Sequence, residues 1–137
     1  MDDMETEQNQ FTGKPQKNSQ NSSYFNGKIG ENRAAAFLEQ AGFIIIARNF
    51  RCKTGEIDIV ALHDQILVFI EVKAWSTYSV ENLEYGINKK KQKKIIETAK
   101  LFLADHGKYR ESTVRFDVVF VHADNITHIK SAFTENS

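Results

Sequence analysis

Two stretches of the chain carry apolar residues at helical spacing, which predicts two helices. The first spans 27–41 and ends before Gly42, because glycine readily adopts the left-handed conformation that closes a helix. The residues that we expect on its buried face are Ile29, Ala36, Phe37 and Ala41. The second spans 88–106, is capped by Asn88 and stops at Gly107. Its apolar face consists of Ile95, Ile96, Ala99, Phe102 and Leu103.

Between and after these helices the pattern changes to short β-branched and apolar runs, which are typical of strands. Runs at 43–50, 57–62 and 66–73 predict three successive strands, and runs at 114–122 and 126–129 predict two more. The order of helix, three strands, helix and two strands predicts an α/β fold. We expect a mixed β-sheet of about five strands flanked by helices.

The N-terminal segment has a different composition from the rest of the chain. Residues 1–24 are dominated by Gln, Asn, Ser and charged residues, which predicts a disordered polar tail followed by a single domain over 25–137. The sequence shows no apolar run near 20 residues and no secretory leader, so we expect no membrane contact. The single cysteine, Cys52, has no partner for an internal disulfide, which fits a reducing cytoplasm.

Four charged residues interrupt the apolar runs of the second and third predicted strands, where a charge needs a partner. We expect these strands to form a hairpin with a two-residue turn at Asp64-Gln65, so that the numbers of paired residues sum to 129. The opposed pairs are then Asp58 with Glu71 and Glu56 with Lys73, all on one face. Asp-Gln is a poor sequence for such a turn, and an odd-length loop would shift the register by one residue.

The charges of the chain balance, with 18 basic and 18 acidic residues, which argues against a surface that coats nucleic acid non-specifically. Five lysines nevertheless stand together at the start of the second predicted helix, at 89–91 and 93–94. They oppose the helix dipole, and a phosphate backbone would offset that cost. The candidate nucleic-acid contacts are Lys90, Lys91, Lys93, Lys94, Arg48 and Arg51. A solvated lysine-rich face, and arginines paired with local acids, are the alternatives.

Several motifs follow one another in order between residues 27 and 133. They are Gly30-Glu31, Arg48-Asn49-Phe50-Arg51, Gly55-Glu56-Ile57-Asp58, Glu71-Val72-Lys73, Lys91-Gln92 and Arg115-Phe116-Asp117. In these motifs the chain resembles the YraN-like family of small endonuclease-like proteins, which is largely uncharacterised. The resemblance implies a restriction-endonuclease-like fold of the PD-(D/E)XK superfamily, similar to archaeal Holliday junction resolvases. It implies a nuclease acting on nucleic acid, with DNA, and branched DNA in particular, as the expected substrate. Such folds often act as a homodimer.

Phosphodiester hydrolysis needs a nucleophilic water and a cation beside the phosphate, and Mg²⁺ typically takes one or two carboxylates plus waters. Asp58 and Glu71 suit an Mg²⁺ or Mn²⁺ ion, and the resemblance adds the carbonyl of Val72 as a third ligand. Lys73 would orient the water or stabilise the transition state. Glu56 would position Lys73.

Glu31 is a further candidate acid because it matches a helix-borne glutamate of the family. In isolation, an acid in the first turns of a helix is explained by the helix dipole. Three alternatives to the nuclease remain open. The four strand charges could form a salt-bridge ladder on a solvated sheet, and the chain could be a structural protein. It could also be a non-catalytic nucleic-acid-binding or adaptor module that retains the nuclease fold.

Overall fold

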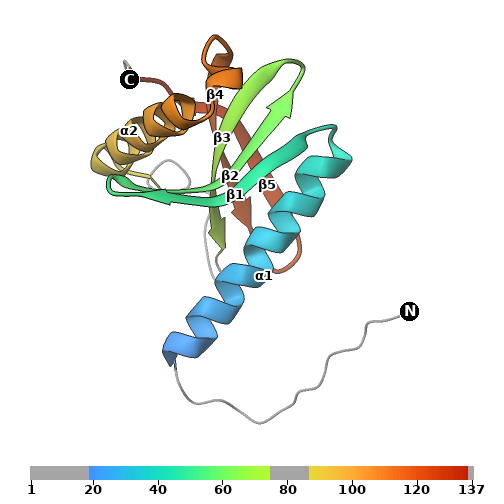
Figure 1. Ribbon diagram of the computed structural model, residues 1–137. Helices are drawn as coiled ribbons and strands as arrows, with labels where there is room; N and C mark the ends of the chain where they lie inside the picture. The colour runs from blue at the N-terminus through green and yellow to red at the C-terminus, as the bar shows by residue number, and fades with distance from the viewer. Residues whose placement is uncertain (1–18, 75–86, 136–137) are drawn as a thin grey trace.

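Five strands form one mixed sheet with a helix on each face (Figure 1). The computed structural model describes residues 19–74 and 87–135, so most of the predicted tail, residues 1–18, lies outside the described residues. The elements are α1 (Ser19–Gln40), β1 (Ile44–Cys52), β2 (Gly55–His63), β3 (Ile66–Ala74), α2 (Lys89–Asp105), the short helix η3 (Gly107–Tyr109), β4 (Thr113–Val121) and β5 (Ile126–Phe133). The mixed sheet of five strands expected from the sequence is confirmed.

The strands lie in sequence order, and neighbours are antiparallel except for the parallel pair β3 and β4. A parallel pair needs a crossover, and α2 lies in the segment that connects these two strands. The C-terminal ends of β3 and β4 therefore lie side by side at the same end of the sheet. Glu71 and Lys73 are near the C-terminal end of β3 and so lie at this end of the sheet.

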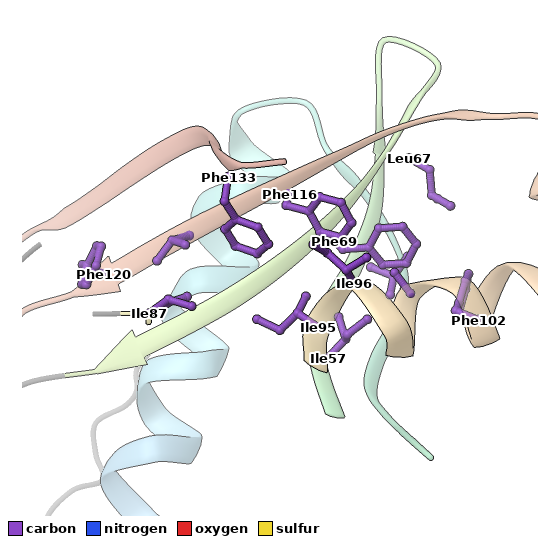
Figure 2. Packing of buried hydrophobic residues seen from close by; sticks show 13 residues of the cluster. Ile57, Leu67, Phe69, Ile87, Ile95, Ile96, Phe102, Phe116, Phe120 and Phe133 are labelled. Carbon is purple, nitrogen blue, oxygen red and sulfur yellow. The ribbon is translucent and has the colours of Figure 1, made fainter. Parts of the chain in front are cut away.

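Each helix covers its own hydrophobic core. α2 packs on β1 and β2, and its core includes Phe69, Phe102 and Phe116 (Figure 2). The ring of Phe69 stacks on Phe116 at 5.7 Å between centroids and meets Phe102 edge to face at the same distance. α1 packs mainly on β3 and β4, and its core contains smaller residues such as Ala34, Ala35, Leu38 and Val68.

The predicted buried face of α1 is wrong except at Phe37, which packs partly against the core, whereas Ala36 and Ala41 are exposed. Ile29 is 43% exposed, and the buried residues of the helix are instead Gly30, Glu31, Ala34, Ala35 and Leu38. The helix also begins at Ser19, within the segment predicted to be a tail. Small residues face the sheet because α1 crosses β3 closely at Gly30, where bulky side chains would hold the two backbones apart.

Replacing Gly30 with alanine should destabilise the protein, because a Cβ at this position would lie 2.5 Å from the Cβ of Ala74. Overpacking of this kind costs about 1–3 kcal/mol. Gly27 is the matched control, since nothing lies within 4 Å of a Cβ added there. Gly27→Ala should raise stability by about 0.5–1 kcal/mol, because alanine favours the helix. Urea unfolding of both variants measures the two effects. Equal shifts in the same direction would contradict the close approach at Gly30.

The predicted hairpin register is confirmed. Every β2–β3 pair from Ile59–Ile70 to His63–Ile66 sums to 129. The two turn residues, Asp64 and Gln65, have φ values of 52° and 69°. Positive φ at both positions is typical of the type I′ turn that suits the twist of a two-residue hairpin. The turn therefore forms without the glycine that such turns usually contain.

The predicted cap and apolar face of α2 are also confirmed. Asn88 accepts a hydrogen bond of 2.8 Å from the backbone N–H of Lys91. Ile95, Ile96, Ala99 and Phe102 are buried, and Leu103 packs partly against the same core.

A buried carboxylate, Asp117, holds β5 on β4 where their register shifts between Phe116 and Val118. Its partners are Arg115 with two hydrogen bonds of 2.8 Å, His128 Nε2 at 2.8 Å and the backbone N–H of Ser131 at 3.0 Å. Burial alone would raise the pKa of Asp117, but the hydrogen bonds from His128, Arg115 and Ser131 lower that pKa below its ordinary value. The carboxylate is therefore ionised, and its network replaces the regular strand ladder.

Candidate metal centre

The strands β2 and β3 separate at the predicted acids and form a fork. Their ladder ends at the pair Ile59–Ile70, although β2 continues to pair with β1 and β3 continues to pair with β4. Asp58 and Glu71 are the first residues beyond this last pair. An oxygen of the Asp58 carboxylate accepts a hydrogen bond of 2.8 Å from the backbone N–H of Val72. The side chain of Asp58 thus bonds to β3 at the point where backbone pairing stops.

Side-chain alternation in β2 reverses at the fork. Ile57 packs in the core beneath α2, whereas Ile59 packs in the core beneath α1, although residues two apart normally share a face. The register of the flanking pairs places Asn49 of β1 across from Asp58, and Asn49 has a φ of 55°. The expectation that all four charged residues share one face by regular alternation is therefore wrong for β2. Its physical reason is the irregular backbone at Asn49 and Asp58.

Burial and three nearby carboxylates make the ionised form of Asp58 unfavourable. Burial raises the pKa of Asp58 from its ordinary value of 3.8 to about 7, and the nearby charges of Glu71, Glu56 and Glu31 add to this effect. The hydrogen bond from the Val72 N–H acts in the opposite direction. A cation bound between Asp58 and Glu71 would offset the repulsion by which Glu71 adds to this rise in pKa.

Two lysines meet at one oxygen of Glu71. The side chain of Glu71 is only 8% exposed, and its Oε2 lies 4.0 Å from Lys73 Nζ and 3.4 Å from Lys91 Nζ. Lys73 is on the same strand, whereas Lys91 comes from the first turn of α2. The approach of Lys91 was missed by sequence reasoning, which treated it only as a nucleic-acid contact. Its position next to Gln92 in a family motif was the one signal that set it apart from the neighbouring lysines.

The predicted pairing of Glu56 with Lys73 is wrong. Glu56 lies 3.3 Å from Nε of Arg51, its partner across the β1–β2 ladder, and Lys73 lies beside Glu71. The hairpin register would have opposed Glu56 and Lys73, but the strands diverge before reaching them. The Arg51 and Glu56 side chains are 73% and 40% exposed, so their ion pair contributes little to stability.

Glu31 connects α1 to β1 beside the fork. It is 8% exposed and accepts hydrogen bonds from Arg48 Nε at 2.8 Å and from Asn49 Nδ2 at 3.0 Å. Arg48 also donates to the side chain of Asn32 at 2.6 Å. Both carboxylate oxygens of Glu31 therefore hold residues of β1, including the strained Asn49 across from Asp58. This arrangement gives Glu31 a supporting position next to the two predicted ligands.

The other four lysines of the cluster lie on the exposed surface of α2, namely Lys89, Lys90, Lys93 and Lys94. Lys89 and Lys93 border a groove of about 330 Å³ between α2 and the end of β5, together with Glu97 and Glu135. The lysines of the cluster therefore have different neighbours in the structure. Lys91 reaches the fork, while Lys93 borders the groove.

The fork offers the donors that a magnesium ion takes. Within 19–74 and 87–135, no three His, Cys, Asp or Glu side chains are grouped as a ready metal cluster. Mg²⁺ does not need such a cluster, because it typically binds one or two carboxylates and keeps several waters. Asp58 and Glu71 supply two carboxylates whose negative charges repel each other, and a divalent cation would offset that repulsion. The residues present therefore fit Mg²⁺ or Mn²⁺. The carbonyl of Val72 stays a prediction as a third ligand.

Comparison with known proteins identifies the family. A family model described as "Uncharacterised protein family UPF0102" matches residues 30–121. The chain belongs to the UPF0102 family. The UPF0102 protein of Treponema pallidum (strain Nichols) is 43% identical over 116 residues, which cover 80% of this chain and 92% of that protein. The UPF0102 protein of Treponema denticola is 42% identical over 121 residues, covering 78% and 93%. UPF0102 protein CLJ_B2665 of Clostridium botulinum (strain 657) is 40% identical over 113 residues, covering 78% and 92%.

The family membership expected from the motifs is confirmed at the level of UPF0102, and these names state no activity. The segment matched by the UPF0102 model includes all the residues described at the fork, namely Glu31, Asp58, Glu71, Lys73 and Lys91. Among the helices of the described residues, none is long and apolar enough to cross a membrane.

Proposed function

We propose that this UPF0102 protein is a metal-dependent nuclease that hydrolyses phosphodiester bonds in nucleic acid. The proposed substrate is DNA, branched DNA in particular, and the proposed cofactor is Mg²⁺ or Mn²⁺. The observation that carries the proposal is the fork, where the half-buried carboxylate of Asp58 neighbours the buried carboxylate of Glu71, which lies 4.0 Å from the ammonium group of Lys73. The order of its motifs, which resembles that of restriction-endonuclease-like enzymes, supports the same function.

The residues of the fork have separate parts in this chemistry. Asp58 and Glu71 would hold the ion, which when bound supplies a water of lowered pKa and positive charge beside the phosphate. Asp58 is held in place by the Val72 N–H, so its orientation does not depend on the ion. The side chain of Lys73 is 27% exposed, and its ammonium group can stabilise the negative charge that develops on the phosphate oxygens.

Basic side chains around the fork would hold the nucleic acid. The exposed lysines of α2 and the exposed Arg51 can approach a phosphate backbone without desolvating a buried charge. Arg48 is 33% exposed and already oriented by Glu31 and Asn32, so little side-chain entropy would be lost on binding. Because resolving a branched duplex requires two cuts, we expect the protein to act as a homodimer.

Calorimetric titration with Mn²⁺ and Mg²⁺ tests the centre. The wild type should bind the ions, and Asp58→Ala and Glu71→Ala should each weaken binding by roughly 100-fold or more, because each removes a ligand. Asp124→Ala is the control, since Asp124 is an exposed carboxylate in the turn between β4 and β5. Absence of binding by the wild type, with or without DNA, would refute the metal centre.

Incubation with junction, flap, single-stranded and duplex DNA tests turnover. Lys73→Ala should slow cleavage by about 10²–10³-fold, because it removes a positive charge next to the phosphate, while metal binding persists. Lys100→Ala is the control, as Lys100 lies on α2 but pairs with Glu135 and Glu97. Equal products from wild type and Lys73→Ala would indicate a contaminating nuclease. DNA binding without cleavage would support the binding module instead.

A further inference from the structure

We infer that Lys91 exchanges partners as the site is filled. It neutralises Glu71 while no metal is bound, and it contacts a phosphate of the nucleic acid once Glu71 binds the ion. This inference rests on the proposed function and assigns Lys91 a positioning role at the metal centre. It goes beyond a general contribution of the lysine cluster to the surface charge.

The charges around Glu71 favour such an exchange. Lys73 and Lys91 both approach Oε2 of this buried carboxylate, and their ammonium groups lie 4.0 and 3.4 Å from it. When Glu71 binds a divalent cation, two ammonium groups at the same oxygen would repel that cation. One of them must withdraw, and Lys91 is the more exposed of the two, at 45% against 27% for Lys73.

The contact of Lys91 is well suited to release. Its distance of 3.4 Å exceeds the 2.7–2.9 Å that is usual for a charge-assisted hydrogen bond, so the lysine is held mainly by charge. A lysine side chain has a flexible stem and three donors, and it can redirect its ammonium group without moving the backbone. A phosphate beside the centre would therefore be within the reach of the same side chain.

The backbone of Lys91 is fixed, which separates the movement of its side chain from that of α2. Its N–H donates to the side chain of Asn88 at 2.8 Å. Gln92 donates from its side chain to the carbonyl of Ile87 at 3.1 Å, and Ile87 is buried in the core beneath α2. The first turn of the helix is thus anchored on both sides of Lys91. Only the ammonium end remains free to change partner.

A comparison of Lys91→Gln with Lys93→Gln tests the exchange, because both variants remove one charge from the first turns of α2. Lys93 is exposed and borders the groove on α2, so its loss reports the general electrostatic effect. In calorimetry with Mn²⁺ and Ca²⁺ and no DNA, Lys91→Gln should bind the ion about 3–10-fold more tightly than wild type, since a competing charge is gone. Lys93→Gln should change this affinity by less than about twofold.

DNA binding should respond in the opposite direction. Fluorescence anisotropy with a labelled DNA junction in Ca²⁺, a hard cation that prefers the same oxygen ligands, should show weaker binding by Lys91→Gln than by Lys93→Gln. In a metal chelator, the affinity of Lys91→Gln should equal or exceed that of Lys93→Gln, because Lys91 is then engaged by Glu71. Lys91→Arg should restore DNA binding in Ca²⁺, since the charge is retained.

Each outcome decides between the exchange and simpler roles. If the two glutamine variants behave alike in both measurements, Lys91 belongs to the general basic surface and the exchange is overturned. A loss of thermal stability without tighter metal binding would also overturn it, because Lys91 would then be a structural counter-ion. If the wild type binds Mn²⁺ through Asp58 but Lys91→Gln binds it no better, only the exchange fails. Absence of metal binding by the wild type overturns the proposed function as well.

Discussion

At pH 8 the Asp58→Asn variant should be more stable than the wild type, by about 4 kcal/mol at most. The pKa of Asp58 is raised from 3.8 to about 7 by burial and by the nearby Glu71, and each pH unit of such a rise corresponds to about 1.4 kcal/mol. The folded protein binds a proton more tightly than the unfolded chain, so this group contributes stability below about pH 4 and loses it as the pH rises through about 7. Asparagine keeps the hydrogen bond from Val72 and carries no charge to repel Glu71.

Urea unfolding between pH 4.5 and 8 measures this effect as the difference between variant and wild type. The difference should be smallest at the acid end, increase through about pH 6 and level off above pH 7. Asp124→Asn, which neutralises an exposed carboxylate, should show no comparable increase. Saturating Mn²⁺ at pH 8 should stabilise the wild type more than Asp58→Asn. A difference that does not depend on pH would show that Asp58 is ionised at no cost in the folded protein.

Replacing Asp117 with alanine should produce the largest destabilisation, about 3–5 kcal/mol, because it leaves buried partners of a charged network unpaired. The Asp117 side chain is 0% exposed, and Arg115 is 17% exposed. The loss would also free the amide of Ser131, whose φ of 52° is strained for a serine. β5 should then be the first part of the sheet to open.

The same urea titrations measure this loss, and amide hydrogen exchange locates it. Exchange in β5 should accelerate more than exchange in β1, the opposite edge of the sheet. Asp124→Ala removes an exposed carboxylate from the connection between β4 and β5 and should change stability by less than about 0.5 kcal/mol. Metal affinity of folded Asp117→Ala should match that of the wild type. A marked drop in metal affinity would instead place Asp117 in the metal centre.

The sequence predicts most of the fold because its strongest signals are local. The even length of the turn at Asp64-Gln65 determines the β2–β3 register, and Asn88 marks the start of α2. The proximity of Asp58 and Glu71 follows from the same register. These features depend on residues that are close together in the chain, where periodicity and turn length are informative.

Other features of the centre arise from contacts between distant segments. The reversal of β2 at Asp58 accompanies the positive φ of Asn49, which Glu31 on α1 holds by a hydrogen bond. The approach of Lys91 to Glu71 depends on how α2 crosses the sheet. Strand alternation alone predicts neither contact, and extending the hairpin register past Ile59–Ile70 wrongly placed Glu56 against Lys73. The buried face of α1 was missed because glycine and alanine carry little hydrophobic signal.

The hydrogen bond between the Val72 N–H and the Asp58 carboxylate has a spectroscopic consequence. An amide proton that donates to a carboxylate experiences a different electric field when that carboxylate gains a proton or a cation. The Val72 cross-peak in a nitrogen–proton correlation spectrum should therefore move with pH near the pKa of Asp58, and again on titration with Mg²⁺. One backbone nucleus would thus report the charge state of the centre.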